Sequence, residues 1–210
     1  MSEIRRGFFV VFEGCDRSGK TTQIQMLLNR FFEEKISYEH FSFPDDQTST
    51  GTFIKKHMSE ILSPESEALL HLANKWESAF EIEKYLDEDR IVIVDRWIDS
   101  GVAYGSSGTG RDVNWMKNLH QDLPKPDCVI YLEIDSRVQE TRKHWGHGVF
   151  ETRSFQNIVR GNYAKLKDVT WKCYDANVPI VLLHNLIYNH IMHLRKSKRE
   201  ESKKNFSKYT

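Results

Sequence analysis

The feature that most constrains this chain is a glycine-bounded turn that follows a short apolar run near its beginning. Residues 8–12 read FFVVF, and Gly14, Gly19, Lys20 and Thr21 then fit the spacing G-x-x-x-x-G-K-[ST]. Glycines let consecutive backbone N–H groups converge on phosphate oxygens, and the start of a helix adds the positive end of its dipole. The stretch therefore predicts a nucleotide-binding P-loop between a buried strand and a helix.

The side chains of this loop are expected to have separate roles. Lys20 can reach the β- and γ-phosphates of ATP, and the Thr21 hydroxyl can ligate Mg²⁺. Charged residues are not needed to cradle phosphate, so Asp16 and Arg17 are candidates for contacting the acceptor and for stabilising charge during transfer. The residues predicted to hold ATP are Gly14, Ser18, Gly19, Lys20, Thr21 and Thr22.

Strand-like and helix-like segments alternate along the whole chain. The predicted strands are 8–12, 38–43, 91–94, 128–132 and 178–183. The first predicted helix follows the P-loop and runs to about residue 34. The others span 52–61, 65–86, 114–120, 135–143, 151–173 and 185–194, and Ser63 and Pro64 mark the start of the helix over 65–86. Such alternation predicts an α/β fold, a five-stranded parallel sheet with helices on both faces. We expect a single domain over 1–194 and a basic tail over 195–210.

Polar residues follow the predicted strands at their carboxyl ends, which form the edge of a parallel sheet where ligands bind. Asp95 follows four apolar residues. This is the pattern of a Walker-B carboxylate, which holds Mg²⁺ directly or through water. The planar guanidinium of Arg96 suits a phosphate clamp. Alone, the pair could equally be a helix cap and a surface arginine; beside a P-loop in the same sheet, the functional interpretation is favoured.

Residues 143–153 are predicted to form a lid, because phosphoryl transfer requires exclusion of water and a closing segment provides it. Gly146 and Gly148 and a mixture of charges favour this interpretation, although an ordinary loop between two helices would have the same composition.

Composition excludes several classes of protein. The 30 basic residues balance the 30 acidic ones, so the chain as a whole gives no argument for nucleic-acid or membrane binding. Residues 195–210 carry seven basic and two acidic side chains and are expected to be a frayed, solvated end. Three cysteines without C-x-x-C spacing fit a reducing compartment. We expect a soluble protein of the cytoplasm, or of the nucleus.

Several motifs together resemble one family, thymidylate kinase. Residues 14–23 (GCDRSGKTTQ) are similar to its P-loop G-x-D-x-x-G-K-[ST]-T-Q. Further similar segments are Phe43-Pro44, 48–51 (TSTG), 69–77 (LLHLANKWE), 95–104 (DRWIDSGVAY), 123–127 (LPKPD) and 146–151 (GHGVFE). The resemblance implies a P-loop nucleoside monophosphate kinase fold with a lid. It also implies a homodimer that transfers the ATP γ-phosphoryl group to dTMP with Mg²⁺.

The resemblance also implies roles for individual residues. Arg96 would contact a phosphate, Asp16 the acceptor, and Tyr104 would lie near the sugar. Arg17 resembles the eukaryotic and viral type, in which the P-loop supplies the catalytic arginine. The implied catalytic residues are Lys20, Arg17, Asp16 and Arg96; the implied metal ligands are Thr21 and Asp95. The implied acceptor-binding residues are Asp16, Phe43, His71, Lys75, Arg96, Ser100, Gly101, Tyr104 and Phe150.

Three positions of the acceptor site depart from the family pattern. Asp46 stands where the family has an arginine that contacts the acceptor phosphate, His71 replaces the aromatic residue that stacks on thymine, and Lys75 replaces the arginine that meets the base. Two alternatives therefore stay open. One is a kinase of another deoxynucleotide or of a nucleoside, and the other is a nucleotide-binding regulatory protein with weak catalysis. A GTPase is rejected, because 74–77 (NKWE) lies within a helix and lacks the aspartate.

Overall fold

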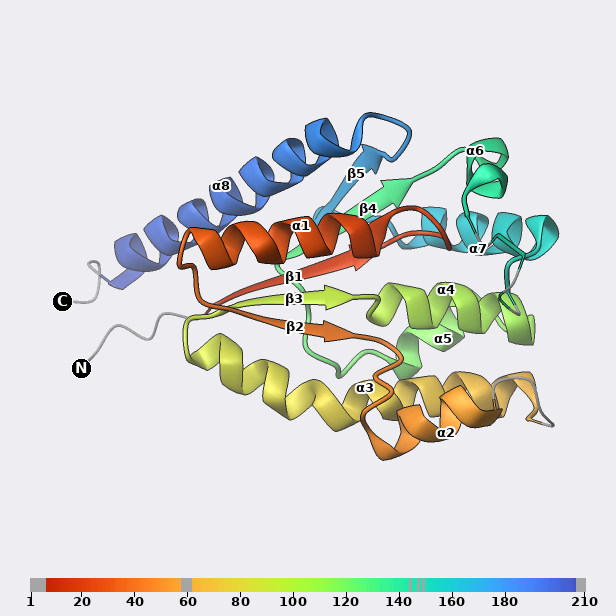
Figure 1. Ribbon diagram of the computed structural model, residues 1–210. Coiled ribbons are helices and arrows are strands. Elements are labelled where there is room, and N and C mark those ends of the chain that lie inside the picture. The colour runs from red at the N-terminus through yellow and green to blue at the C-terminus, as the bar shows by residue number, and fades with distance from the viewer. Residues whose placement is uncertain (1–6, 58–61, 144, 147, 149, 207–210) are drawn as a thin grey trace.

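A five-stranded parallel sheet forms the centre of the molecule, as predicted (Figure 1). The computed structural model describes residues 7–57, 62–143, 145–146, 148 and 150–206. The strands are β1 (Phe8–Glu13), β2 (Tyr38–Ser42), β3 (Ile91–Asp95), β4 (Cys128–Glu133) and β5 (Trp171–Asp175), in the order β2-β3-β1-β4-β5. β1 lies between β3 and β4, with Phe12 opposite both Asp95 and Ile130. The P-loop that follows β1 therefore begins at the middle of the sheet edge.

Helices cover both faces because the side chains of the buried strands alternate between two cores. Phe8, Val10 and Phe12 of β1 pack with helices α1 (Lys20–Glu33) and α8 (Ile180–Phe206). Phe9 and Val11 face the opposite core, built with α3 (Pro64–Asp87), α4 (Ile98–Thr109), α5 (Val113–Leu119) and α7 (Arg153–Leu166). The short helices α2 (Ser49–His57) and α6 (Ser136–Thr141) complete the chain. Within the described ranges, no helix is long and apolar enough to cross a membrane.

Polar caps fix where several helices begin. The Ser63 hydroxyl accepts a hydrogen bond from the Ser66 amide at 3.2 Å, and Pro64 is the first helical residue, as the sequence predicts for α3. In the same way Thr152 caps α7 by accepting from the Phe155 amide at 3.3 Å. These caps place the first turns of both helices at the edge of the sheet that carries the P-loop.

The prediction of the last strand is wrong. Residues 178–183 are not a strand: the helix α8 begins at Ile180, and the fifth strand is β5. The helix expected over 151–173 ends at Leu166, which leaves residues 171–175 for the sheet. The apolar run VPIVLL is too short for its periodicity to separate a strand from the start of a helix. Within the described residues, β5 pairs only with β4 at the sheet edge and is half-exposed, so its sequence, WKCYD, lacks a continuous apolar signal.

The C-terminal segment also differs from its prediction. Residues 195–206 continue α8, and α8 is not frayed at residue 195. Lys198 Nζ donates to Asp127 Oδ2 at 2.6 Å and to the Gly7 carbonyl at 3.2 Å, and Arg199 Nη2 contacts Asp89 Oδ2 at 2.5 Å. These contacts join the end of α8 to the segments that enter β1, β3 and β4, which explains why the helix continues. Residues 207–210 lie outside the described part of the chain.

Candidate active site

The P-loop connects β1 to α1 through a tight turn. Gly14 has φ of 144°, and a Cβ at this position would lie 2.7 Å from the Leu132 carbonyl oxygen, so a side chain is excluded. Ser18 is buried, and α1 begins directly after Gly19, whose φ is 97°. The amides of the first helical turn therefore point into the loop, an arrangement that binds phosphate.

Lys20 lies at the floor of this loop and is buried. Its Nζ donates to the carbonyls of Gly14 and Cys15 at 3.0 and 2.9 Å. Burial and the nearby positive charge of Arg96 lower the pKa of Lys20 to about 8. The described residues place no carboxylate within salt-bridge distance of this ammonium group, so an anionic phosphate would be a favourable partner for it.

Two of the predicted residues form a site that fits Mg²⁺. The Thr21 hydroxyl donates to Asp95 Oδ2 at 3.0 Å, while Asp95 Oδ1 is buried and has no hydrogen-bond partner among the residues that the structure describes. An unpartnered carboxylate oxygen beside a hydroxyl matches the oxygen ligands that Mg²⁺ prefers. The described residues contain no cluster of three or more His, Cys, Asp or Glu side chains able to hold a metal.

Two arginines lie at the outer wall of the phosphate pocket. Arg17, with φ of 58°, contacts Glu151 Oε1 through Nε at 2.8 Å. Arg142, at the end of α6, donates to the carbonyls of Arg17 and Ala176 at 2.7 and 2.8 Å. The predicted residues Gly19, Lys20, Thr21, Thr22, Asp95, Arg96, Asp16 and Arg17 line this pocket together with Arg142 and Glu151.

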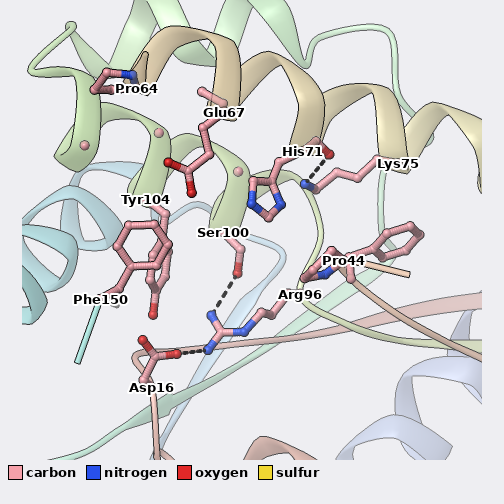
Figure 2. Close-up of a pocket in the computed structure, with 15 residues that line it drawn as sticks. Asp16, Pro44, Pro64, Glu67, His71, Lys75, Arg96, Ser100, Tyr104 and Phe150 are labelled. Carbon is pink, nitrogen blue, oxygen red and sulfur yellow. Dashed lines mark hydrogen bonds and ion pairs between the residues drawn. The ribbon is translucent and has the colours of Figure 1, made fainter. Parts of the chain in front are cut away.

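A second pocket opens between α3, α4 and the predicted lid (Figure 2). All nine residues that the resemblance assigns to the acceptor line it: Asp16, Phe43, His71, Lys75, Arg96, Ser100, Gly101, Tyr104 and Phe150. Asp16 and Arg96 lie at one end, and the α3 side chains lie across the pocket from them (Figure 2). The structure thus brings these residues together from five separate segments, and their individual roles stay predictions.

Asp16 and Arg96 form an ion pair at the bottom of this pocket. Arg96 Nη2 contacts Asp16 Oδ1 at 2.5 Å, and Gln156 Nε2 of α7 donates to Asp16 Oδ2 at 2.6 Å. Burial alone would raise the pKa of Asp16, but the charges of Arg96 and Lys20 outweigh it and hold that pKa below its usual value. Asp16 is therefore ionised at neutral pH and can accept a hydrogen bond from an acceptor hydroxyl.

The turn that carries Arg96 is held by a second, buried carboxylate. Glu13, at the end of β1, is fully buried and accepts hydrogen bonds from the Trp97 and Ser100 amides at 2.9 and 3.0 Å. Its other oxygen accepts from Ser100 Oγ and, at 2.9 Å, from the Tyr163 hydroxyl. Glu13 thereby caps the N-terminus of α4 from another strand and fixes the turn in which Arg96 adopts φ of 68°.

His71 and Lys75 lie one helical turn apart on the pocket face of α3. Burial and the charge of Lys75 lower the pKa of His71 to about 4, so the imidazole is neutral at physiological pH. Burial also lowers the pKa of Lys75 to about 8, and its Nζ donates to the His71 carbonyl at 3.1 Å. Asp46, by contrast, does not line the pocket, and its carboxylate pairs with Lys55 Nζ at 2.5 Å.

Aromatic rings close the side of the pocket next to the predicted lid. The rings of Tyr104 and Phe150 meet edge to face with centroids 6.0 Å apart, and Phe150 stacks on Phe155 at 5.0 Å. Gln156 Nε2 donates to the Phe150 carbonyl at 3.0 Å and so ties this segment to Asp16. Residues 144, 147 and 149 of the predicted lid lie outside the described residues.

Comparison with known proteins identifies the family. The sequence profile described as thymidylate kinase matches residues 12–187. The chain belongs to the thymidylate kinase family. A thymidylate kinase of Danio rerio is 35% identical over 185 residues, which span 86% of this chain and 87% of that protein. A protein of Invertebrate iridescent virus 6 is 31% identical and covers 87% of this chain, with 86% of its own length matched. A solved thymidylate kinase structure from Candida albicans superposes with a TM-score of 0.77 at 28% identity, over 90% of this chain and 92% of that chain.

Membership in the thymidylate kinase family confirms the predicted fold and enzyme class, but the structure adds residues that the sequence did not reveal. Glu13, Gln156 and Arg142 each contact or position a predicted site residue. Glu13 and Gln156 look like ordinary polar residues in the sequence, and only the tertiary fold brings them to α4 and Asp16. Arg142 could have been proposed from the sequence, because it lies at the end of a predicted helix and directly precedes the predicted lid.

Proposed function

We propose that this protein transfers the γ-phosphoryl group of ATP to dTMP, giving dTDP and ADP, with Mg²⁺ as the cation. The observation that carries this proposal is that the two pockets share Asp16 and Arg96. One pocket contains the P-loop and the other contains the residues expected to bind the acceptor. A phosphate on a nucleotide in the second pocket can therefore approach the terminal phosphate of ATP in the first.

The residues at the junction fit the demands of phosphoryl transfer. A phosphate oxygen of the acceptor attacks the γ-phosphorus, and the bond from that phosphorus to the β–γ bridging oxygen breaks as ADP leaves. Lys20, Arg17 and Arg96 supply positive charge to the oxygens of the group that moves. Mg²⁺, held through Thr21 and Asp95, would neutralise charge on the β- and γ-phosphates. Asp16 would hold the acceptor at the correct distance.

The acceptor base would lie between α3 and α4. Lys75 can donate to a carbonyl oxygen of the base, and the neutral imidazole of His71 offers a flat surface beside it. Tyr104 and Phe150 would cover the sugar and exclude water. The name of the family refers to a thymidine nucleotide. The donor of Lys75 and the flat ring of His71 support such a nucleotide as the acceptor.

A coupled ADP-release assay with ATP and Mg²⁺ tests the proposal against a panel of nucleoside monophosphates. We expect dTMP to be phosphorylated, with dUMP turned over more slowly because it lacks the methyl group. Turnover of another nucleotide but not of dTMP would assign His71, Lys75 and Asp46 to a different acceptor. Binding of ATP without turnover of any acceptor would support the regulatory alternative.

We further propose that the protein is a homodimer formed through α3. Leu69, Trp76 and Phe80 expose 47%, 46% and 79% of their surface, although they are large apolar residues. With Ala73 they follow the 4-3-4 spacing of a helix-packing seam, on the side of α3 away from the pocket. A second copy would cover this stripe. Light scattering should give twice the chain mass, and Phe80→Glu should give the monomer; a monomeric wild-type chain would contradict the proposal.

A further inference from the structure

Glu67 occupies the acceptor pocket without an assigned role. It lies on α3 one turn before His71, and its carboxylate points into the pocket (Figure 2). Its Oε1 atom is buried and accepts no hydrogen bond from the described residues. Burial raises the pKa of this carboxyl group above its usual value. A buried acceptor without a partner is unfavourable and needs an explanation.

Four of the residues that line the pocket with Glu67 carry no side-chain hydrogen-bond donor. They are Pro64 and Ala68 on α3, and Gly105 and Gly108 on α4. A Cβ added to Gly105 would lie 3.5 Å from Ala68, whereas a Cβ at Gly108 would meet nothing within 4 Å. This end of the pocket is therefore narrow at Gly105 and open at Gly108. The missing partner of Glu67 can enter with a ligand.

On the pocket face of α3, Lys75 offers a base a hydrogen-bond donor and Glu67 offers it an acceptor. Lys75 Nζ uses one of its three hydrogens for the His71 carbonyl and retains two. Glu67 lies eight residues earlier, two helical turns away, with His71 between them. Under the proposed function, the phosphate lies at Asp16 and Arg96, so the far edge of the base faces this row. Thymine provides its C4 carbonyl oxygen for Lys75. Its ring N–H lies on one side of that oxygen, and the methyl group on the other side cannot donate to a carboxylate such as Glu67.

We propose that Glu67 is a specificity-determining residue that accepts a hydrogen bond from the far edge of the acceptor base. The site would then favour an acceptor whose base carries, besides the carbonyl oxygen and ring N–H that thymine also has, a further N–H or O–H donor at its far edge. Two kinds of base share this chemistry, a pyrimidine with a 5-hydroxymethyl group and guanine with its exocyclic amine. Cytosine does not, since its amine would face Lys75.

Matched pairs of acceptors test the inference, which rests on the proposed function. 5-Hydroxymethyl-dUMP differs from dTMP by one hydroxyl, and dGMP differs from dIMP by one amine. We expect the ratio of kcat/KM within at least one pair to favour the donor-bearing member in the wild-type enzyme. Glu67→Met should lower that ratio by about tenfold or more, the effect of losing a hydrogen bond to a charged group. Glu67→Gln, which keeps one oxygen acceptor, should lower it less.

Controls separate this inference from the proposal beneath it. Glu65→Met changes a carboxylate of the same helix that pairs with Arg111 outside the pocket, and it should leave both ratios as in the wild type. Ratios that stay unchanged in Glu67→Met, with dTMP still phosphorylated, overturn the role of Glu67 alone. Failure of the wild-type enzyme to phosphorylate dTMP or any acceptor of the two pairs overturns the proposed function, and the inference fails with it.

Discussion

The two halves of the candidate site are built in different ways. The phosphate half is built mainly from the P-loop, with Asp95 and Arg96 at the end of β3 and with Arg142 and Glu151 from two further segments. The acceptor half consists of side chains from α3, α4 and the segment before α7. Every predicted residue type of the phosphate half follows the family motif, whereas His71 and Lys75 in the acceptor half, and Asp46 outside the pocket, do not.

This difference has a physical cause. Phosphate presents the same charged oxygens in every nucleotide, so one arrangement of amides and cations serves for all of them. A nucleobase is distinguished by a few donors and acceptors at its edge, and several combinations of side chains can meet them. We therefore expect changes in the phosphate half to abolish transfer and changes in the acceptor half to shift substrate preference.

The largest expected effect belongs to Lys20. Lys20→Ala should lower kcat by at least about a thousandfold, because the charge that faces the transferred group is lost. The fold should remain, since Lys20 is a buried cation whose lowered pKa shows that its environment disfavours the charge. A thermal melt checks this point, with Lys56→Ala on the exposed face of α2 as the control. An unfolded Lys20→Ala variant would instead show a structural role.

The next effect concerns the two arginines at the phosphate pocket. Arg17→Ala should lower kcat by about a thousandfold with little change in the KM for ATP, because a catalytic arginine acts on charge in the transition state. Arg142→Ala should instead raise the KM for ATP, since Arg142 holds the P-loop and the segment after β5 through carbonyl contacts. Steady-state kinetics of both variants distinguish the roles. Turnover by Arg17→Ala at the wild-type rate would remove Arg17 from the catalytic residues.

The sequence predicted the phosphate half almost completely for the same physical reason. The loop is local, so the spacing from Gly14 to Thr21 already determines which amides and side chains converge. Asp95 and Arg96 could be added because parallel strands end at one edge of the sheet. Gln156 and Glu13 could not be found, because each acts through a partner more than 80 residues away in the chain. Nothing in their local sequence distinguishes them from surface polar residues.

The errors in the fold have a similar origin. β3 (Ile91–Asp95) is buried on both faces, and the apolar run 91–94 alone predicts a strand there. β5 is an edge strand whose residues alternate and are partly exposed, so the more apolar start of α8 gave the stronger strand signal. The end of α8 is held by Lys198 and Arg199, whose acidic partners lie at the ends of other strands. Composition alone predicts a solvated tail there, because it contains no information on those partners.

Glu13 tests how far the phosphate half depends on the fold beneath it. Glu13→Gln should reduce the free energy of unfolding by about 1–3 kcal/mol, because the new amide group would face donors. It should also raise the KM for the acceptor by about tenfold, because one hydrogen bond from Glu13 to the turn that carries Arg96 is lost. Tyr163→Phe removes one donor to the same carboxylate and should have a smaller effect on both. Lower stability with wild-type kinetics would mean that Glu13 supports the fold and does not position Arg96.

The smallest effect belongs to Lys75 in the acceptor half. Its pKa of about 8 means that it is charged below this pH and loses its proton above it. At saturating ATP, whose phosphates keep Lys20 charged, kcat/KM for dTMP should therefore fall as pH rises from 7 to 9. We expect a change of only about threefold to fivefold, because the neutral amine still donates hydrogen bonds. Lys75→Arg keeps its charge throughout this range and should give a flat profile. An equal decline in both enzymes would assign the alkaline titration to another group, and the base would then be recognised without the charge of Lys75.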